Sequence, residues 1–213
     1  MIGSDTLYAM LESKHLLEGC DPYWWPNAGT FEVVVGAVLT QNTTWHAVEK
    51  SLKALEHALT LETFSGLQEE VLKEAIRPSG YYNQKAERLL LLAKAIEREF
   101  GTFDAFQHGV TRQWLLSQKG IGPETADSIL CYGCFREEMV VDTYTRRLLK
   151  TYGIVWKEYE RYKAYLEEGI RTRFEGAYAL RFARFHGMIV EYGKQMKRGP
   201  YSTEMQIHSH ISD

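Results

Sequence analysis

The sequence predicts an all-α fold. Apolar residues recur at helical spacing in most segments, as at Leu7, Met10 and Leu11 near the start of the chain. No segment shows the sustained alternation of apolar and polar residues that a half-buried strand requires, and no internal repeat is found. Of 213 residues, 45% are hydrophobic and 25% are charged, which is typical of a globular protein with a sizeable core.

The predicted helices follow one another along the chain. An amphipathic helix is expected over 5–18, followed by the loop DPYWWPN (21–27), which two prolines close. The segment FEVVVGAVL (31–39) is apolar nearly all round, so we expect a buried helix with Thr30 or Asn27 as its cap. Further helices are predicted around Val48–Leu55, over 67–76, over 84–99 with Asn83 as its cap, from Thr111 into a glycine turn, from Pro123 onward, and over 146–152, 158–174 and 176–193, before a loosely ordered tail from Arg198.

A tight turn between two predicted helices stands out in the middle of the chain. The chain turns through Gly120, Ile121 and Gly122, and a helix begins at Pro123, which suits a first helical position. We expect Ile121 to plug inward between the helices. The backbone N–H groups at the start of the second helix, with the positive end of its dipole behind them, form a seat for an anion. Because backbone amides do not distinguish bases, this seat suits a DNA phosphate bound without sequence preference.

Two motifs together carry a resemblance to a known family. The turn lies in GIGPETA (120–126), and VVDT (140–143) follows after about one helix and a loop. A short glycine turn before a helix is common, but the two motifs at this spacing are specific. Over about residues 28–195, the sequence resembles the helix-hairpin-helix DNA glycosylases, the superfamily that includes endonuclease III and the adenine, oxoguanine and alkylpurine glycosylases.

The resemblance implies two helical lobes with a DNA-binding cleft between them. One lobe would be residues 31–134, ending in the hairpin, and the other would combine 1–30 with 135–213. Asp142 matches the family's catalytic carboxylate. Breaking the bond between a base and deoxyribose builds positive charge on the sugar, which a nearby carboxylate can stabilise while it orients or deprotonates the attacking water. From the residues alone, Asp142 could also be a simple helix N-cap, and the two roles are compatible.

The resemblance also implies a set of DNA contacts. Gln41, in AVLTQNT (37–43), matches the residue that fills the gap left by an extruded base, and Asn42 lies beside it. Tyr81 takes the position of a wedge that enters between base pairs. Taken alone, these residues could instead be ordinary turn residues and a surface tyrosine. The hairpin residues expected to contact DNA are Gly120, Ile121, Gly122 and Thr125.

Aromatic residues suggest the class of base. Trp24 and Trp25 stand side by side in a loop, where they could plug a gap between helices or form a stacking wall for a base. With Trp45, they fall in loops that the family uses to line the base pocket. Alkylated purines such as 3-methyladenine are positively charged, and indole faces attract cations. The sequence is similar to the small bacterial 3-methyladenine glycosylases, in which WWPN and AVLTQNT recur.

Glu124 occupies the position where family members that also cut the DNA backbone carry a lysine nucleophile. A carboxylate cannot form a Schiff base, so the resemblance implies a monofunctional glycosylase that leaves an abasic site. Glu124 could bind the extruded base, hold a basic group near Asp142, or simply favour the helix N-terminus. Lys119 precedes the turn, whereas the family's nucleophile follows it, so we do not expect it to substitute.

No iron–sulfur cluster is expected. Endonuclease III carries four C-terminal cysteines around such a cluster, but the matching region FHGMIVEYGK (185–194) has none. Cys131 and Cys134 are interpreted as core thiols, because no second pair completes a zinc site. Family members often bind a monovalent cation through hairpin carbonyls, which here would be those of Leu116, Gln118 and Ile121, so the resemblance implies a candidate site for structural Na⁺ or K⁺.

The sequence therefore predicts a monomeric DNA N-glycosylase that acts on double-stranded DNA and releases 3-methyladenine or a related alkylpurine. The net charge of −3 argues mildly against DNA binding, although the C-terminal third is rich in Lys and Arg. No apolar run approaches a membrane span and no secretory signal is seen, so we expect a cytoplasmic protein of bacterial or archaeal type. The alternatives are a glycosylase for uracil, mispaired adenine or an oxidised base, and a non-catalytic helix-hairpin-helix DNA-binding protein.

Overall fold

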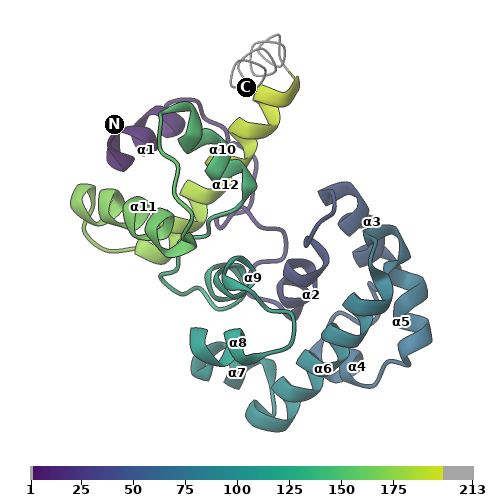
Figure 1. The fold of residues 1–213 in the computed structure, drawn as a ribbon. Coiled ribbons are helices and arrows are strands. Elements are labelled where there is room, and N and C mark those ends of the chain that lie inside the picture. The colour runs from purple at the N-terminus through teal and green to yellow at the C-terminus, as the bar shows by residue number, and fades with distance from the viewer. Residues whose placement is uncertain (1, 199–213) are drawn as a thin grey trace. The chain divides into compact units, whose positions relative to one another are not determined.

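The structure, a computed structural model, describes residues 2–198, and the regular structure in this part of the chain is helical throughout (Figure 1). The prediction of an all-α fold is confirmed. The chain divides into two compact units. The central unit is Trp25–Glu138, and the terminal unit combines Met1–Trp24 with Met139–Asp213. Beyond its first residue, the tail predicted from Arg198 lies outside the described residues.

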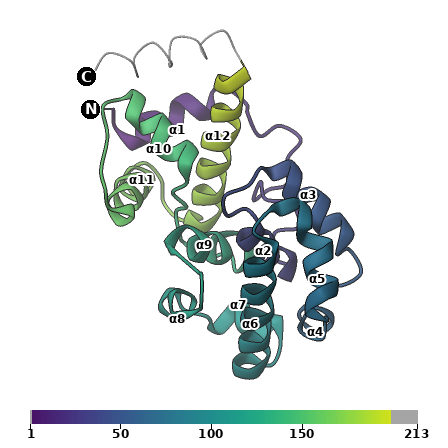
Figure 2. The same ribbon diagram turned by 45° about the vertical axis from the view of Figure 1, so that its right-hand side comes forward.

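The core of the central unit forms around α2 (Phe31–Leu39), in which every residue except Glu32 is buried. Helices α3 (Trp45–Ala54), α6 (Tyr82–Phe100) and α9 (Pro123–Ser128) pack against it (Figure 2). The predicted buried helix is therefore confirmed, and its apolar surface on all sides is explained by partners on several sides. The remaining helical elements of this unit are α4 (Leu61–Ser65), α5 (Glu69–Ile76), a 3₁₀ turn (Arg77–Ser79), α7 (Phe103–Gly109), α8 (Arg112–Ser117) and a π-helical turn (Ile129–Gly133).

Threonine side chains start several helices of the central unit. Thr44, Thr60, Thr102 and Thr111 each accept a hydrogen bond from the backbone amide three residues further on, which satisfies a donor that the helix itself leaves without an acceptor. The predicted helix start at Thr111 is confirmed. Helices α4 and α7 are not among the sequence predictions, because helices this short show too few turns for a periodic pattern.

The prediction that Asn83 caps the next helix is wrong. Helix α6 begins at Tyr82, and Tyr81 before it takes the left-handed conformation, with φ of +49°. The carbonyl of Tyr81 accepts the first helical hydrogen bond, from the amide of Lys85 at 3.0 Å. Gly80, with φ of +67°, provides the chain reversal before the helix, so Asn83 lies in its first turn.

The terminal unit packs α1 (Ser4–Glu12), α10 (Thr143–Thr151) and α11 (Tyr159–Arg173) with the long helix α12 (Tyr178–Arg198). The helix predicted over 5–18 ends early, because the Ser13 hydroxyl bonds back to the carbonyl of Met10 and His15 turns left-handed with φ of +53°. None of the helices in the described part of the chain is long and apolar enough to span a bilayer. The buried side chains of this unit include Leu7, Leu11, Leu149, Leu166, Ile170, Phe182 and Phe185.

A buried ion pair ties α8 to α9. The guanidinium of Arg112 donates to the fully buried carboxylate of Asp127 through Nε at 2.6 Å and Nη2 at 3.3 Å. Replacing Arg112 with Leu removes this partner from a carboxylate that has no access to water, so we expect the free energy of unfolding to fall by about 3 kcal/mol. Urea denaturation measures the loss.

The control for this prediction is Arg98→Leu, since the Arg98 side chain is 72% exposed and its pair with Glu99 is a surface pair. We expect that change to cost less than about 1 kcal/mol. Equal losses in the two variants would contradict a structural role for the buried pair.

Candidate functional site

The hairpin is built as the sequence predicts. Helix α8 ends at Ser117, the amide of Ile121 donates to the carbonyl of Gln118 at 3.2 Å, and α9 opens at Pro123. The carbonyl of Gly122 accepts the first intrahelical bond, from Ala126 at 2.9 Å. The backbone amides before Ala126 have no acceptor within the helix, and an anion could bind to them.

Burial, backbone conformation and free space differ among the three residues of the turn, Gly120, Ile121 and Gly122. Ile121 is 6% exposed and belongs to the core of the central unit, so its predicted role as an inward plug is confirmed. Gly120 has φ of +79°, which favours glycine, and a Cβ there would lie 2.4 Å from the Cδ of Arg88, so this flexible side chain would have to move. A Cβ on Gly122 would meet no atom within 4 Å, so the protein leaves open space beside this residue.

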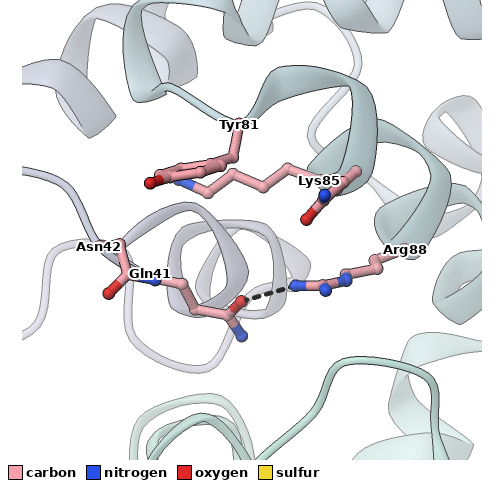
Figure 3. A pocket seen from close by; sticks show the side chains of 6 residues that line it. Gln41, Asn42, Tyr81, Lys85 and Arg88 are labelled. Atoms are coloured by element: carbon pink, nitrogen blue, oxygen red, sulfur yellow. Dashed lines mark hydrogen bonds between the residues drawn. The ribbon is translucent and has the colours of Figure 1, made fainter.

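Gln41 is bonded to the hairpin. Its Nε2 donates to the carbonyl of Gly120 at 3.1 Å and to Oγ1 of Thr125 at 3.0 Å. Its Oε1 accepts from Nη1 of Arg88 at 3.4 Å (Figure 3). The turn after α2, the hairpin and α6 thus meet at one amide side chain, and the Gln41 side chain must exchange these bonds if it enters DNA.

A hollow of about 200 Å³ lies beside Gln41. Tyr81 stands at it with a side chain that is 66% exposed, as a wedge would be, and Asn42 is exposed with φ of +54° (Figure 3). Sequence reasoning missed the residues of α6 in this lining, although 81, 84, 85 and 88 share one helical face and this spacing could have revealed them. The lining residues are Gln41, Asn42, Tyr81, Gln84, Lys85 and Arg88.

The adjacent tryptophans have different environments. Trp25 is 7% exposed in the central unit, where its ring centroid lies 5.4 Å from that of Trp45 and 5.1 Å from that of Tyr132. It fills space inside the unit, as the plug interpretation expects. Trp45 is half-buried at the start of α3, and its Nε1 donates to Glu49 at 2.9 Å.

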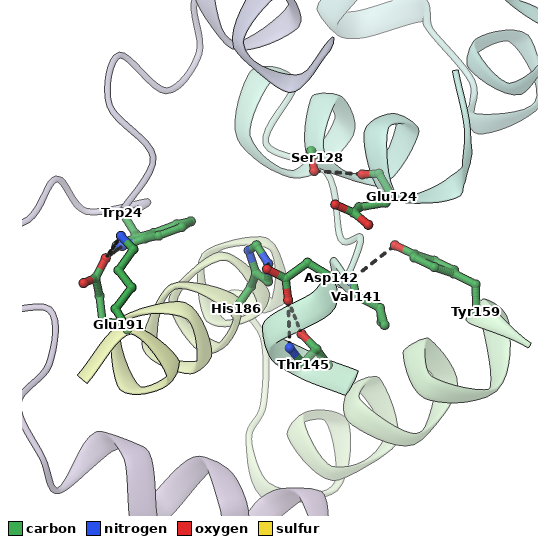
Figure 4. A network of polar contacts seen from close by, with 10 residues as sticks. Trp24, Glu124, Ser128, Val141, Asp142, Thr145, Tyr159, His186 and Glu191 are labelled. Atoms are coloured by element: carbon green, nitrogen blue, oxygen red, sulfur yellow. Dashed lines mark hydrogen bonds and ion pairs between the residues drawn. The ribbon is translucent and has the colours of Figure 1, made fainter. Parts of the chain in front are cut away.

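Trp24 belongs to the terminal unit and is half-buried. Its Nε1 donates to Oε1 of Glu191 at 3.1 Å, and Nζ of Lys194 lies 5.8 Å from its ring centroid (Figure 4). The ring packs closely on α12 because residue 187 is glycine, where a Cβ would lie 2.5 Å from the Cγ of Trp24. The glycine therefore fixes how closely the indole approaches the helix.

Asp142 is the N-cap of α10. Its Oδ1 accepts from the backbone amide of Thr145 at 2.8 Å and from the Thr145 hydroxyl at 2.9 Å (Figure 4). The amide of Val141 donates to the hydroxyl of Tyr159 at 3.2 Å, which steadies the chain just before the carboxylate. The side chain is 15% exposed. The capping interpretation is therefore confirmed, and it leaves Oδ2 pointing away from the helix.

His186 of α12 faces Oδ2 of Asp142, with its Nε2 3.6 Å away. It is 4% exposed, and its ring contacts Trp24 edge-on at 5.5 Å between centroids. Sequence reasoning gave no role to His186. It lies far from Asp142 in the chain and no local motif marks it, so only the packing of α10 against α12 reveals the pair.

The surroundings of Asp142 favour its ionised form. Burial raises the pKa of the carboxyl, but the contact with His186 and the two hydrogen bonds from Thr145 lower it more, so the pKa lies below its ordinary value. An ionised carboxylate can stabilise a developing positive charge and orient a water molecule, whereas it has no proton to donate.

Glu124 lies in the first turn of α9 in the central unit and is exposed. Its backbone carbonyl accepts from the hydroxyl of Ser128 at 2.8 Å (Figure 4). Lys119 precedes the hairpin turn and pairs with Glu87 at 2.6 Å. Position 124 therefore carries a carboxylate, and the nearby amine of Lys119 is paired with Glu87.

The candidate cation ligands lie at the end of α8 and in the turn. The Gln118 carbonyl accepts one hydrogen bond, and a carbonyl oxygen has two lone pairs, so it can accept a second partner. Carbonyls at a helix C-terminus carry partial negative charge. Binding of Na⁺ or K⁺ by the carbonyls of Leu116, Gln118 and Ile121 stays a prediction.

The cysteines fit the interpretation as core thiols. Cys131 is fully buried and Cys134 is 8% exposed. Burial raises the pKa of the Cys134 thiol to about 12, which disfavours the thiolate that metals bind. In residues 2–198, no group of three or more His, Cys, Asp or Glu residues is placed to hold a metal ion.

An all-α fold with a glycine hairpin and a helix-capping aspartate at this spacing defines the helix-hairpin-helix class of DNA repair proteins. The family model described as "HhH-GPD superfamily base excision DNA repair protein" matches residues 35–172, and the chain belongs to this superfamily. It is a DNA glycosylase of base excision repair.

Several known proteins are similar to the chain. A crystal structure of the H. pylori 3-methyladenine DNA glycosylase MagIII bound to 1,N6-ethenoadenine is 42% identical, has a TM-score of 0.87, and is matched over 91% of this chain and 98% of that one. A Methanocaldococcus jannaschii protein provisionally named as a DNA repair glycosylase is 38% identical over 82% of this chain and 81% of its own length. A structure of an endonuclease III–DNA complex is 20% identical with a TM-score of 0.72 over 91% and 87% of the two chains, a likeness of fold.

Replacing Thr145 with Val tests the electrostatics of Asp142. The change removes the hydroxyl donor to Oδ1 and keeps the backbone donor, so the ionised form is less stabilised. We expect the pKa of Asp142 to rise toward its ordinary value. NMR titration of the carboxyl carbon, assigned with Asp142→Asn, measures the pKa directly.

The matched control is Thr151→Val in the same helix, where the hydroxyl bonds to the carbonyl of Leu148 instead. This variant should titrate as the wild type does. An unchanged pKa of Asp142 in Thr145→Val would show that the hydroxyl has no part in stabilising the anion.

Proposed function

We propose that this protein is a monofunctional glycosylase that releases 3-methyladenine or a related alkylated purine from double-stranded DNA, acting as a monomer. The observation that carries the proposal is the surroundings of Asp142: a carboxylate with a lowered pKa, faced by His186, which in turn contacts the indole of Trp24. The similarity to the H. pylori 3-methyladenine glycosylase supports the same substrate class.

The chemistry of a cationic base suits this carboxylate. A positively charged purine leaves as a neutral base when the electron pair of the glycosidic bond moves onto it, so it needs little help from a general acid. The positive charge then lies on the sugar, where ionised Asp142 stabilises it and orients the water that attacks the anomeric carbon. The water proton passes to solvent or to the carboxylate, and an abasic site remains.

Indole rings give the preference for a cationic base. The Lys194 ammonium lies 5.8 Å from the ring centroid of Trp24, so a positively charged base would bind at the opposite face of this indole. We propose that Trp24 and Trp45 contribute to the base pocket, with Trp25 supporting Trp45 from the interior through their ring contact. Glu124, which is exposed, is proposed to contact the extruded base.

The hairpin supplies the grip on the DNA backbone. The amides around Gly122 would bind a phosphate, and the open space beside this residue lets the backbone approach it. A monovalent cation held by the carbonyls of Leu116, Gln118 and Ile121 would add positive charge there. Gln41, Asn42 and the exposed Tyr81 would occupy the space that the flipped nucleotide leaves.

Asp142→Asn tests the catalytic carboxylate. Asparagine caps helices as well as aspartate does, so α10 should keep its cap while the negative charge is lost. We expect the rate of 3-methyladenine release from methylated DNA to fall by roughly 10³-fold, measured by chromatography of the freed bases. The control is Asp104→Asn, since the Asp104 side chain is 84% exposed in the other unit.

The outcomes separate the alternatives. Release of uracil or of an oxidised base in place of 3-methyladenine would replace the proposed substrate with another lesion. A wild-type protein that binds abasic DNA and releases no base from any of these substrates would favour a non-catalytic hairpin protein. Equal release by Asp142→Asn and the wild type would remove Asp142 from the mechanism.

The absence of lyase activity is tested on a duplex with one abasic site. Since Glu124 cannot form an imine, borohydride should trap no covalent complex, and the strand should stay intact until alkali is added. An endonuclease III with lyase activity serves as the positive control. Strand cleavage without alkali would contradict the proposal, and loss of that cleavage in Lys119→Ala would then identify Lys119 as the nucleophile.

A further inference from the structure

A buried lysine joins the two turns that carry the proposed DNA-inserting residues. Lys85 lies in the first turn of α6 and is 2% exposed. Its Nζ donates to the carbonyl of Leu39 at 2.9 Å and to the carbonyl of Ser79 at 2.8 Å. One ammonium group therefore bonds two backbone carbonyls that lie forty residues apart in the chain.

Each of these carbonyls comes directly before a turn at the hollow. Leu39 is the last residue of α2 and precedes Gln41 by two residues, and Ser79 precedes Tyr81 by two residues. Both carbonyls lie at helix C-termini, where partial negative charge favours a cation. The bonds of Lys85 thus set the distance between the turn of Gln41 and the turn of Tyr81.

The same face of α6 is linked to the hairpin through Gln41. Arg88 lies three residues after Lys85 and donates to Oε1 of Gln41, and its side chain packs where a Cβ on Gly120 would be. Gln41 in turn donates to the carbonyl of Gly120. The three segments proposed to meet DNA are therefore connected through two neighbouring cationic side chains of one helix (Figure 3).

We propose that Lys85 is a positioning residue for base extrusion, which holds the Gln41 turn and the Tyr81 turn at a fixed separation so that both side chains enter the duplex together. This inference rests on the proposed DNA contacts of Gln41 and Tyr81. Lys85 itself touches neither base nor sugar in this role. Its effect reaches the DNA through the two carbonyls that it binds.

Enclosing the charge of Lys85 has a cost that an apolar side chain would not have. Burial lowers the pKa of Lys85 to about 8, with a smaller contribution from Arg88, so the folded protein loses free energy by enclosing this charge. An apolar side chain would avoid that loss but would leave the two carbonyls without their donor. The ammonium therefore gives a defined geometry at a cost in stability.

The experiment compares Lys85→Met with the wild type. Methionine has similar length and no donor. The probe is a duplex with a tetrahydrofuran abasic analogue beside 2-aminopurine, whose fluorescence rises when inserted side chains unstack it. This readout needs no base excision, so it stays informative even if the proposed substrate is wrong.

We expect Lys85→Met to lose most of the fluorescence rise while binding the duplex within about threefold of the wild type through the hairpin. On methylated DNA, release from duplex should fall about tenfold, whereas release from heat-denatured strands, which need no insertion, should change less than about twofold. The control is Lys94→Met, on an exposed site of the same helix.

A double variant tests whether Lys85 acts through Tyr81. If it does, Lys85→Met should add little to the loss caused by Tyr81→Ala, because the two changes remove the same step. Lys85→Gln, which keeps one neutral donor, replaces Lys85→Met if the methionine variant does not fold. A full fluorescence rise, equal losses on duplex and single strands, or fully additive effects with Tyr81→Ala would each overturn the proposal.

Discussion

The carboxylate of Asp142 is contacted from two helices. Thr145 bonds one oxygen from within α10, and His186 of α12 faces the other. Together they lower the pKa of the group although burial raises it. The bond from the Thr145 amide also starts α10, so the helix cannot form in this way without orienting the carboxylate. Asp142 therefore both caps α10 and presents a negative charge, and the packing of α10 against α12 in the terminal unit fixes the position of its carboxylate.

In the central unit, polar side chains hold three turns in place. The turn after α2, the turn before α6 and the hairpin have few apolar residues of their own to bury. Lys85 of α6 bonds the carbonyls of Leu39 and Ser79 beside the first two turns. The hairpin is bonded to Gln41, which accepts in turn from Arg88 of α6. Buried polar networks of this kind are costly if any member is lost, and they define one arrangement when complete.

The sequence was sufficient for features that depend on neighbouring residues. The all-α fold, the buried helix at 31–39, the hairpin turn with Ile121 inward and the capping position of Asp142 all follow from local spacing. Features that depend on distant contacts could not be predicted. His186 has no local signal, and the separate environments of Trp24 and Trp25 follow from the division of the chain between them. Asn83 was misassigned because the left-handed Tyr81 starts the helix earlier than composition suggests.

The left-handed backbone of Tyr81 has a consequence for the evolution of this protein. A tyrosine in that conformation costs about 1 kcal/mol relative to glycine or asparagine, which adopt it readily. Selection for heat resistance alone would therefore favour replacing Tyr81 by glycine or asparagine, and the molecule would gain stability as it lost an exposed aromatic side chain at the hollow. If related proteins keep an aromatic residue at this position, that residue is selected for its contact with DNA and not for the stability of the fold.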